Sequence, residues 1–484
     1  MLQEKLVKVP DSLKSFDLET YLPSLKSFEF WERLPNDQKA EFVRQGQEAM
    51  KEGIPSLPAS LFMDFRRTGN RVHFEIPYFK RRILLLRMVK AYCAGDRHPD
   101  ILDGIIDLLS VICDEWSWVL PAHNWPNENA LPPVQPPRVD LFAANTASLM
   151  ALTVHLLNIP LLKEADRLIL RVYQECRRRC IQPYMENNQH WWMGFEKVGN
   201  HGELNNWTPW ITDNFLHTLF LLHPSEEEMQ RGTKRAVQIL NHYLNVLQPD
   251  GGCDEGPSYW DHAIGSLFGC LDILEFLTGS SLSLMEDPFL KKAASYLHRI
   301  HVEGNYFANF ADCPGRLDHM PTGLIIRMGR ILQDESLIQL GGELGQIEVP
   351  GQDSPVEAFS THRDIRNLMF VFLSEDLLIP REAKAGRDVF PDSQIYIKRT
   401  DSLSFACKGG HNHESHNHND VGQFVLYAGG LPLLIDPGVG DYTRDTFNEN
   451  RYTIWSMQSS WHNLPVVNGV EQKEGLEYRA SSFE

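Results

Sequence analysis

Apolar residues recur at helical spacing through most of the chain. In the segment ILDGIIDLLSVICDEW, which begins at residue 101, apolar side chains stand at positions 102, 105, 106, 109 and 112. This i, i+3, i+4, i+7 spacing predicts a helix with one buried face. Comparable stripes predict helices over 81–92, 139–157, 162–176, 211–222, 233–247, 263–277 and 289–301.

Short breaks rich in proline, glycine and asparagine separate these segments, as in LNIP, QPDGG and LTGSS. Breaks of this length favour successive αα-hairpins. Hairpins stacked in series close into a ring or extend as a solenoid, so that each buries its neighbour's open face. The pattern predicts a helical domain over residues 1–385, without a convincing strand between about 37 and 375.

After residue 385 the pattern changes to short β-branched or aromatic runs. The segments 393–399, 402–407, 423–429, 431–436 and 464–469 are bounded by Gly, Asn, Asp or Pro, which is typical of strands. We therefore predict a second, all-β domain over 386–484. The sequence ends after few strands, and a sheet stopped there would keep an unpaired edge, so we expect this domain to be truncated.

The acidic balance limits the choice of partner. The 484 residues carry 64 acidic and 46 basic side chains, a net charge of −18. A general nucleic-acid binder needs a basic face, so we expect no nucleic-acid partner. The basic runs FKRRILLLR and ECRRRC are interpreted as solvated or salt-bridged helix faces. An acidic polysaccharide is not excluded, because local arginines can make a positive cleft.

The chain shows no signal of a membrane or of export. No long apolar run follows the N-terminal lysines, and no apolar segment is long enough to span a bilayer. The eight cysteines are scattered, and the pair Cys176 and Cys180 is interpreted as two thiols, not as a zinc site. We expect a cytoplasmic protein with reduced thiols and no membrane partner. A mature periplasmic or secreted form whose leader had been removed would look the same.

The stretch HNHESHNHND, at 411–420, holds four histidines within eight residues. If 415–419 is extended, His416 and His418 share one face, since strand residues two apart point the same way. Asp436 lies at the end of one predicted strand, and His462 lies at the start of another. Together with His418 they give two imidazoles and a carboxylate, a credible donor set for zinc. A polar loop without metal is the alternative.

Two further segments carry candidate chemistry. In NNWTPW, Asn205, Asn206 and Trp207 precede a helix predicted to begin near Thr208, and amides beside an indole are suited to binding a sugar. An Asn-rich helix cap with a core tryptophan explains the same residues. In DGGCDEGPSYWDH, Tyr259 and His262 would share a helix face, whereas the carboxylates of residues 254 and 255 raise the possibility of a glycoside hydrolase.

Together these residues resemble a known family. HNHESHNHNDVGQFVLYAGGLPLLIDPG, followed by RYTIWSMQSSWHN, is similar to the C-terminal domain of heparinase II/III-type polysaccharide lyases, and NNW and DEGPSY resemble the two active-site segments of that family. The resemblance implies an N-terminal (α/α) toroid followed by an antiparallel β-sandwich.

The resemblance also implies roles. Tyr259 and His416 match the catalytic tyrosine and histidine, and Asn206 matches the amide that neutralises the uronate carboxylate. His418, Asp436 and His462 match the ligands of a structural zinc. Asn205, Trp207, His413, Tyr442 and Arg451 are assigned to substrate binding. Some members have a histidine where this chain has Trp207, which moves the assignment toward a heparinase III-like site.

The function implied is a lyase that cleaves 4-linked uronic-acid glycans by β-elimination, with a heparan sulfate-like chain or another oligouronide as its acidic substrate. An alginate or oligoalginate lyase is the alternative on the same scaffold. A glycoside hydrolase using Asp254 or Glu255 and a non-catalytic glycan-binding protein stay open beside it. The sequence gives no oligomeric state, and leaves open which of Tyr259 and His416 is the base.

Overall fold

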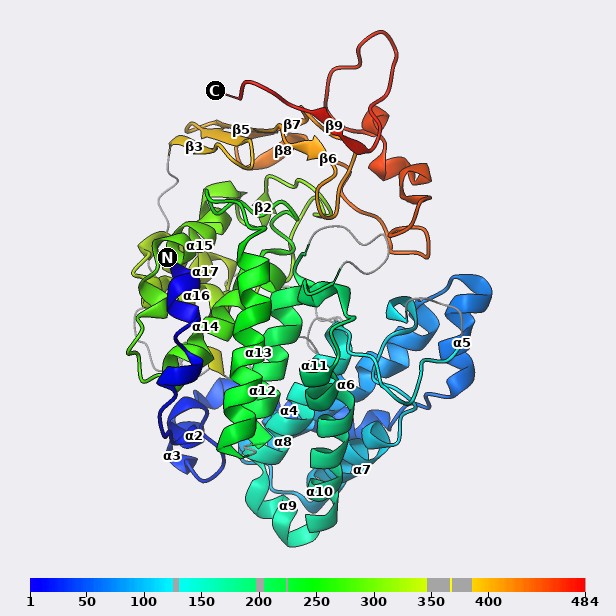
Figure 1. Cartoon of the computed structure of the whole chain (residues 1–484), viewed down its shortest axis with the longest axis vertical. Helices are drawn as coiled ribbons and strands as arrows, with labels where there is room; N and C mark the ends of the chain where they lie inside the picture. Colours follow the sequence, from blue (N-terminus) through cyan, green and yellow to red (C-terminus); the bar gives the residue numbers. More distant parts are fainter. Residues whose placement is uncertain (125–129, 197–203, 223–224, 346–365, 368–384, 484) are drawn as a thin grey trace.

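The computed structural model describes residues 1–483 except 125–129, 197–203, 223–224, 346–365 and 368–384. Among the described residues, helices predominate up to residue 344, and all strands except the short β1–β2 hairpin follow from residue 386 (Figure 1). The helices are α1 Leu2–Leu6, α2 Leu18–Tyr21, α3 Phe28–Glu32, α4 Asn36–Glu52, α5 Ala59–Thr68, α6 Val72–Cys93, α7 Pro99–Cys113, α8 Leu141–Leu156, α9 Asn158–Glu164, α10 Asp166–Cys176, α11 Gln182–Glu186, α12 Trp207–Leu222, α13 Glu226–Leu244, α14 Ser266–Leu277, α15 Pro288–Ile300, α16 Thr322–Leu332 and α17 Glu335–Leu344.

The long helices form an inner and an outer layer. Helices α8, α12 and α14 are buried almost all round, and α12 packs against α8, α13 and α14. The outer helices α4, α7, α10 and α13 each bury one face. This difference follows from sequence, because a helix that is apolar on every side must be enclosed whereas an amphipathic one can meet solvent. The layers are those of stacked helical hairpins, as predicted.

The strands are β1 His301–Glu303, β2 Tyr306–Phe307, β3 Gly386–Phe390, β4 Ile395–Arg399, β5 Leu403–Lys408, β6 His411–Asn412, β7 Phe424–Ala428, β8 Leu431–Leu434 and β9 Gly475–Arg479. An antiparallel sheet has the order β3-β4-β5-β7-β8, while β6 pairs with β9. The buried face of the five-stranded sheet, which includes Ile397, Ala406 and Val425, lies over the helical region (Figure 1).

Three connections fix this sheet to the helices. Arg299 on α15 donates to Asp388 Oδ1 and to the Val389 carbonyl, both at 2.9 Å. Arg399 on β4 donates to the His301 carbonyl at 2.9 Å. The third connection is the carboxylate of Asp250, which accepts the backbone N–H groups of residues 392 and 393, each at 2.8 Å. The β3–β4 end of the sheet is therefore held by charge-assisted bonds.

Several predicted elements differ from the structure. The segment 464–469 is not a strand of the sheet: Val467 and Val470 form an isolated bridge around Asn468–Gly469, whose positive φ angles are those of a tight hairpin turn. The prediction missed β3 and β9, and the β1–β2 hairpin lies inside the predicted all-helical region. The boundary at 385/386 falls beside residues outside the described ranges and stays a prediction.

None of the described helices is by itself long and apolar enough to cross a membrane. Helices α8 and α9, which are bent by 84° relative to each other, reach the length and apolar composition of a membrane span only when the two are taken together.

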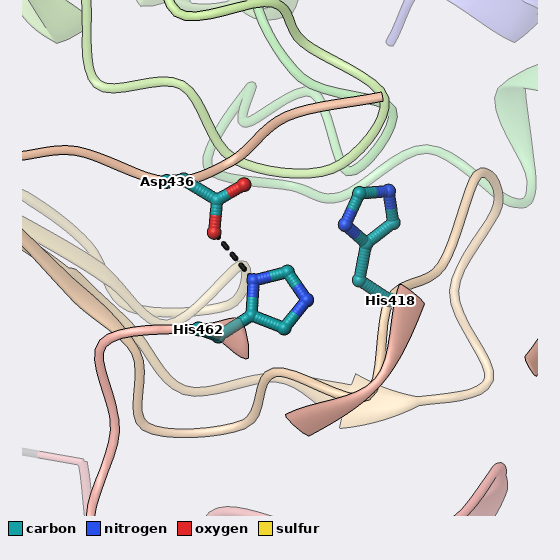
Figure 2. Close-up of side chains that lie close together, drawn as sticks. All are labelled: His418, Asp436 and His462. Atoms are coloured by element: carbon teal, nitrogen blue, oxygen red, sulfur yellow. Dashed lines mark hydrogen bonds and ion pairs between the residues drawn. The ribbon is translucent and has the colours of Figure 1, made fainter. Parts of the chain in front are cut away.

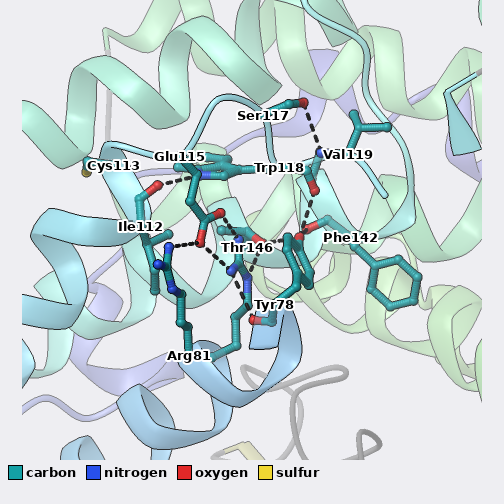
Figure 3. A network of polar contacts seen from close by, with 12 residues as sticks. Tyr78, Arg81, Ile112, Cys113, Glu115, Ser117, Trp118, Val119, Phe142 and Thr146 are labelled. Carbon is teal, nitrogen blue, oxygen red and sulfur yellow. Dashed lines mark hydrogen bonds and ion pairs between the residues drawn. The ribbon is translucent and has the colours of Figure 1, made fainter. Parts of the chain in front are cut away.

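A buried ion pair joins α6 to the segment that follows α7 (Figure 3). Glu115 accepts from Nη1 of Arg82 at 2.8 Å and from Nη2 at 2.6 Å, and Arg81 adds a bond at 3.1 Å. The side chains of Arg82 and Glu115 are 1% and 2% exposed. Of the two interpretations of the basic run at 79–87, a solvated or a salt-bridged helix face, the structure shows salt bridges. Arg82, however, is buried in the core.

We expect Glu115→Ala to lower the free energy of unfolding by about 3–5 kcal/mol, because it leaves two buried guanidinium groups without their carboxylate. Denaturant unfolding followed by far-ultraviolet circular dichroism measures this loss. Asp114 is the matched control: its carboxylate binds Arg171 at 2.9 Å, but both side chains are about half exposed or more. Asp114→Asn should change stability by less than about 1 kcal/mol. Equal losses in the two variants would contradict the assignment.

Candidate active site

A cavity of about 2790 Å³ lies between the helical region and the strands. One wall is formed by the start of α12, the loop after α13 and the segment around Asp312. The other wall comes from residues 408–416 and 439–452. Asn206, Tyr259 and His416, the three predicted catalytic residues, all line this cavity. The fold therefore brings together side chains that lie more than 200 positions apart in the sequence.

Tyr259 contacts a second tyrosine across the cavity. Its hydroxyl lies 2.6 Å from the hydroxyl of Tyr442, which in turn donates to Asp312 Oδ2 at 2.9 Å. Burial, followed by the charge of Asp312, raises the pKa of Tyr259 above its usual value. Arg451 acts in the opposite direction, but burial and the charges of Asp312 and Glu255 outweigh it.

His416 lies in a turn between two carboxylates. Its φ is +56°, so the expected extended conformation of 415–419 is wrong. Nδ1 of His416 lies 2.6 Å from Asp312 Oδ2, and Nε2 lies 3.2 Å from Glu255 Oε2. Burial opposes the charged ring, but Asp312 and then Glu255 outweigh it and raise the pKa of His416 to about 9. The ring centre lies 4.0 Å from that of Tyr259, so the predicted catalytic pair is in contact.

Asn206 is held by the same glutamate. Its backbone N–H donates to Glu255 Oε1 at 2.9 Å, and its side-chain amide donates to Glu255 Oε2. The loop that carries Glu255 turns at Gly256, where φ is +86° and an added Cβ would meet the Phe310 carbonyl oxygen at 2.3 Å. Only glycine permits this approach. The turn brings Glu255 and Tyr259 beside the segment that carries Asp312.

The carboxylate of Asp254 also lines the cavity. Burial, followed by the charges of Glu255 and Glu414, raises the pKa of Asp254 to about 7. Lys408 lies in this cluster and donates to Glu414 at 2.6 Å. Asp254 is therefore a carboxylate of the cavity whose pKa is raised toward neutrality.

The predicted substrate contacts lie around the cavity. Asn205 accepts the Trp207 backbone N–H at 3.1 Å, and Trp207 packs against Trp191 with ring centres 5.3 Å apart. His413 is exposed at the rim. Arg451 differs, because its guanidinium is buried and donates to Asp312 and to two backbone carbonyls. It holds the loop 446–451 in place, and its substrate contact, like the others, stays a prediction.

A second cluster lies behind His416, in the β region (Figure 2). His418, Asp436 and His462 are buried, and one ligand atom from each lies within 4.8 Å of the others. Nδ1 of His462 lies 2.5 Å from Asp436 Oδ2. Gly438 donates its N–H to Asp436 Oδ1 at 2.8 Å, which orients that carboxylate. The structure thus assembles the predicted metal-binding set.

The donor atoms of this cluster fit a cation. Nδ1 of His418 and Nε2 of His462 are buried without a hydrogen-bond partner among the described residues. Nε2 of His418 lies 2.8 Å from Asp312 Oδ1, so the ring carries its proton there and keeps the Nδ1 lone pair free. A metal-binding histidine commonly donates its second nitrogen to a carboxylate in this way. The group can therefore hold a metal ion.

Asp312 is the residue that sequence reasoning missed. It lies in the irregular segment FADCPG, 104 positions before His416, where no periodicity or motif marks it. Its pKa is held well below the usual value: burial opposes this, but the hydrogen bonds from His416 and His418 outweigh burial. Its contacts with both histidines make it central to the site.

Comparisons with known proteins agree with this architecture. Residues 382–481 match the family described as "Heparinase II/III-like, C-terminal". The crystal structure of heparinase III superposes with a TM-score of 0.53 at 14% identity, covering 81% of this chain and 54% of that one. A second structure, the heparinase III BT4657 gene product, gives 0.51 at 15% identity and covers 87% and 60%. No curated protein matches the sequence.

The resemblance predicted from the histidine-rich segment is confirmed by these matches. The C-terminal region is similar to heparinase II/III-like C-terminal domains, and the chain has the fold of heparinase III, with helices followed by an antiparallel sheet. At identities of 14% and 15% the likeness concerns the fold. This chain spans between half and two thirds of the length of the two heparinase III structures.

Proposed function

We propose that this protein is a polysaccharide lyase that cleaves a 4-linked uronic-acid glycan by β-elimination. The observation that carries the proposal is the contact of Tyr259 with His416, beside N–H donors that bind a carboxylate. Asn206 and His416 both point N–H groups at one carboxylate, that of Glu255. In the proposed complex the Asn206 amide would turn from Glu255 to the uronate carboxylate, on which β-elimination places negative charge.

The acid–base chemistry falls to Tyr259 and His416. The reaction removes the proton at C5 of the uronate and returns a proton to the oxygen that leaves C4. When the two lie on the same side of the sugar ring, one side chain serves both steps. When they lie on opposite sides, a base and a separate acid are needed, and Tyr259 and His416 are the two candidates that line the cavity. The stereochemistry at C5 therefore decides which group is base.

For the metal group we propose zinc. Two imidazoles and a carboxylate suit this ion, which structural sites hold by nitrogen, sulfur and oxygen donors. When bound, the ion would fix His418, Asp436 and His462 to one another and so stabilise the loop that carries His416. Its role is structural, because His416 directs its own nitrogens to Asp312 and Glu255.

The substrate is an acidic glycan, such as the heparan sulfate that heparinase III-type folds suggest, or an alginate-like oligouronide. Described residues that line the cavity include nine carboxylates and seven lysines or arginines. This near balance favours a chain whose charge comes from its uronates over a densely sulfated one, which would meet repulsion from the carboxylates.

The test is a panel of heparan sulfate, unsulfated glycosaminoglycan, alginate and oligouronides, followed by near-ultraviolet absorbance and mass spectrometry. A lyase gives unsaturated uronyl ends, and the summed product mass equals that of the substrate. Products that have gained one water would contradict the lyase and favour a hydrolase that uses Asp254 as acid, since its pKa of about 7 suits that role. Binding without any product would favour a glycan-binding protein.

A further inference from the structure

One carboxylate of the helical region accepts four hydrogen bonds from the β region. Asp312 Oδ1 accepts from His418 Nε2 at 2.8 Å and from Arg451 Nη2 at 2.9 Å. Asp312 Oδ2 accepts from His416 Nδ1 at 2.6 Å and from Tyr442 Oη at 2.9 Å. The side chain of Asp312 has no exposed surface. Two acceptor positions on each oxygen are thus filled, which is the full capacity of a carboxylate.

This saturation fixes where protons lie on both histidines. An ionised carboxylate only accepts, so His418 carries a proton on Nε2 and His416 carries one on Nδ1. Nδ1 of His418 is consequently left as a lone pair that faces Asp436 and His462 (Figure 2). Nε2 of His416 is directed toward Glu255, within the substrate cavity. A single carboxylate therefore orients one ring for a metal and the other for substrate.

The same argument sets the direction of the tyrosine pair. Tyr442 gives its proton to Asp312, so in the 2.6 Å contact between the two hydroxyls Tyr442 is the acceptor and Tyr259 the donor. The proton of Tyr259 thereby points along a chain that ends at Asp312. No other described residue contacts His416, His418 and Tyr442 together.

We propose that Asp312 is the positioning residue of this site, which couples metal binding at His418 to the geometry of His416 and Tyr259. It touches neither the metal nor the substrate and acts through the rings that it orients. This inference rests on the proposed lyase function for its kinetic part only, because its effect on the metal ligand can be measured without any substrate.

The decisive variant is Asp312→Asn, which keeps the shape but replaces one acceptor oxygen by a donor amide. At least one of the four donors then faces an N–H group, and the histidine protons lose their fixed positions. We expect zinc affinity, measured by chelator competition, to fall about 10- to 100-fold, as for other partners of metal-binding histidines. The visible spectrum of the Co²⁺-loaded protein should change as the His418 ring reorients. With a cleavable glycan, kcat should fall about 100-fold or more with little change in KM.

Asp250 provides a matched control for a merely structural role. It is also a buried carboxylate of the helical region that accepts four hydrogen bonds, from the N–H groups of Gly252 and residues 392 and 393 and from the Ser393 hydroxyl. It contacts none of the residues assigned to catalysis or metal. Asp250→Asn should lower the thermal midpoint while leaving zinc affinity and kcat within about twofold of the original protein.

The outcomes separate the two proposals. The coupling is overturned if Asp312→Asn binds zinc within twofold of the original affinity and shows only a lower thermal midpoint, as expected for Asp250→Asn. Cleavage by the original protein together with unchanged kcat in Asp312→Asn overturns it as well and leaves the lyase intact. If the original protein cleaves no uronate glycan, the lyase function fails, and the zinc measurement still decides the role of Asp312.

Discussion

We expect Tyr259→Phe to lose about 10²- to 10⁴-fold in kcat, the range that an acid–base group contributes, while the protein keeps its fold. The substitution removes only the hydroxyl, and the ring keeps its contact with His416 at 4.0 Å between centres. The hydroxyl is the atom that exchanges a proton with the uronate in the proposed reaction. Initial rates from the absorbance of unsaturated ends measure the loss, and circular dichroism checks the fold.

Tyr243 is the matched control for this variant. It lies on α13, is buried and lines the same cavity, but it contacts neither His416 nor Asp312 in any described hydrogen bond. Tyr243→Phe therefore removes a phenol hydroxyl from the same wall and should leave kcat within a few-fold of the original. If Tyr259→Phe retained activity at the level of Tyr243→Phe, Tyr259 would have no part in the chemistry.

The second large effect concerns the metal group. We expect the purified protein, once loaded, to hold about one zinc, and His462→Ala to lose it, because one of three protein ligands is removed. Loss of the ion should also lower stability, since a ligand at a thousand times its dissociation constant stabilises a protein by about 4 kcal/mol. Elemental analysis gives the zinc content, and thermal unfolding with and without a chelator gives the stability.

His413→Ala is the control, because His413 belongs to the same histidine-rich loop but is exposed and lies outside the ligand cluster. Its zinc content and its response to the chelator should match those of the original protein. Zinc near one equivalent in His462→Ala, or none in the original protein after saturation, would refute the assignment.

The helical region was predictable because its signal is local. An apolar stripe such as that of 101–116 depends only on residues a few positions apart, and α7 forms where that stripe lies. The prediction of strands was wrong where a local turn sequence decided the backbone conformation more than apolar composition did. Residues 464–469 are apolar enough for a strand, yet Asn468 and Gly469 turn the chain within the segment.

The sequence predicted which side chains lie together at the candidate site, but only part of their geometry. The family resemblance implied separate roles for His416 and His418, and an extended 415–419 would have placed both side chains on one face. The structure instead gives His416 a left-handed conformation. The two rings nevertheless converge on one carboxylate from opposite sides of a turn. That carboxylate, Asp312, lies in another region of the fold, so no spacing in the sequence links it to the histidines.

The connections between the sheet and the helices carry a mechanical consequence. Arg299, Arg399 and Asp250 fix the β3–β4 end of the sheet, and Asp312 fixes the opposite side through four bonds. Opening of the cavity by rotation of one wall against the other would therefore break buried charged contacts. A glycan therefore has to enter and leave the cavity without rotation of one wall against the other.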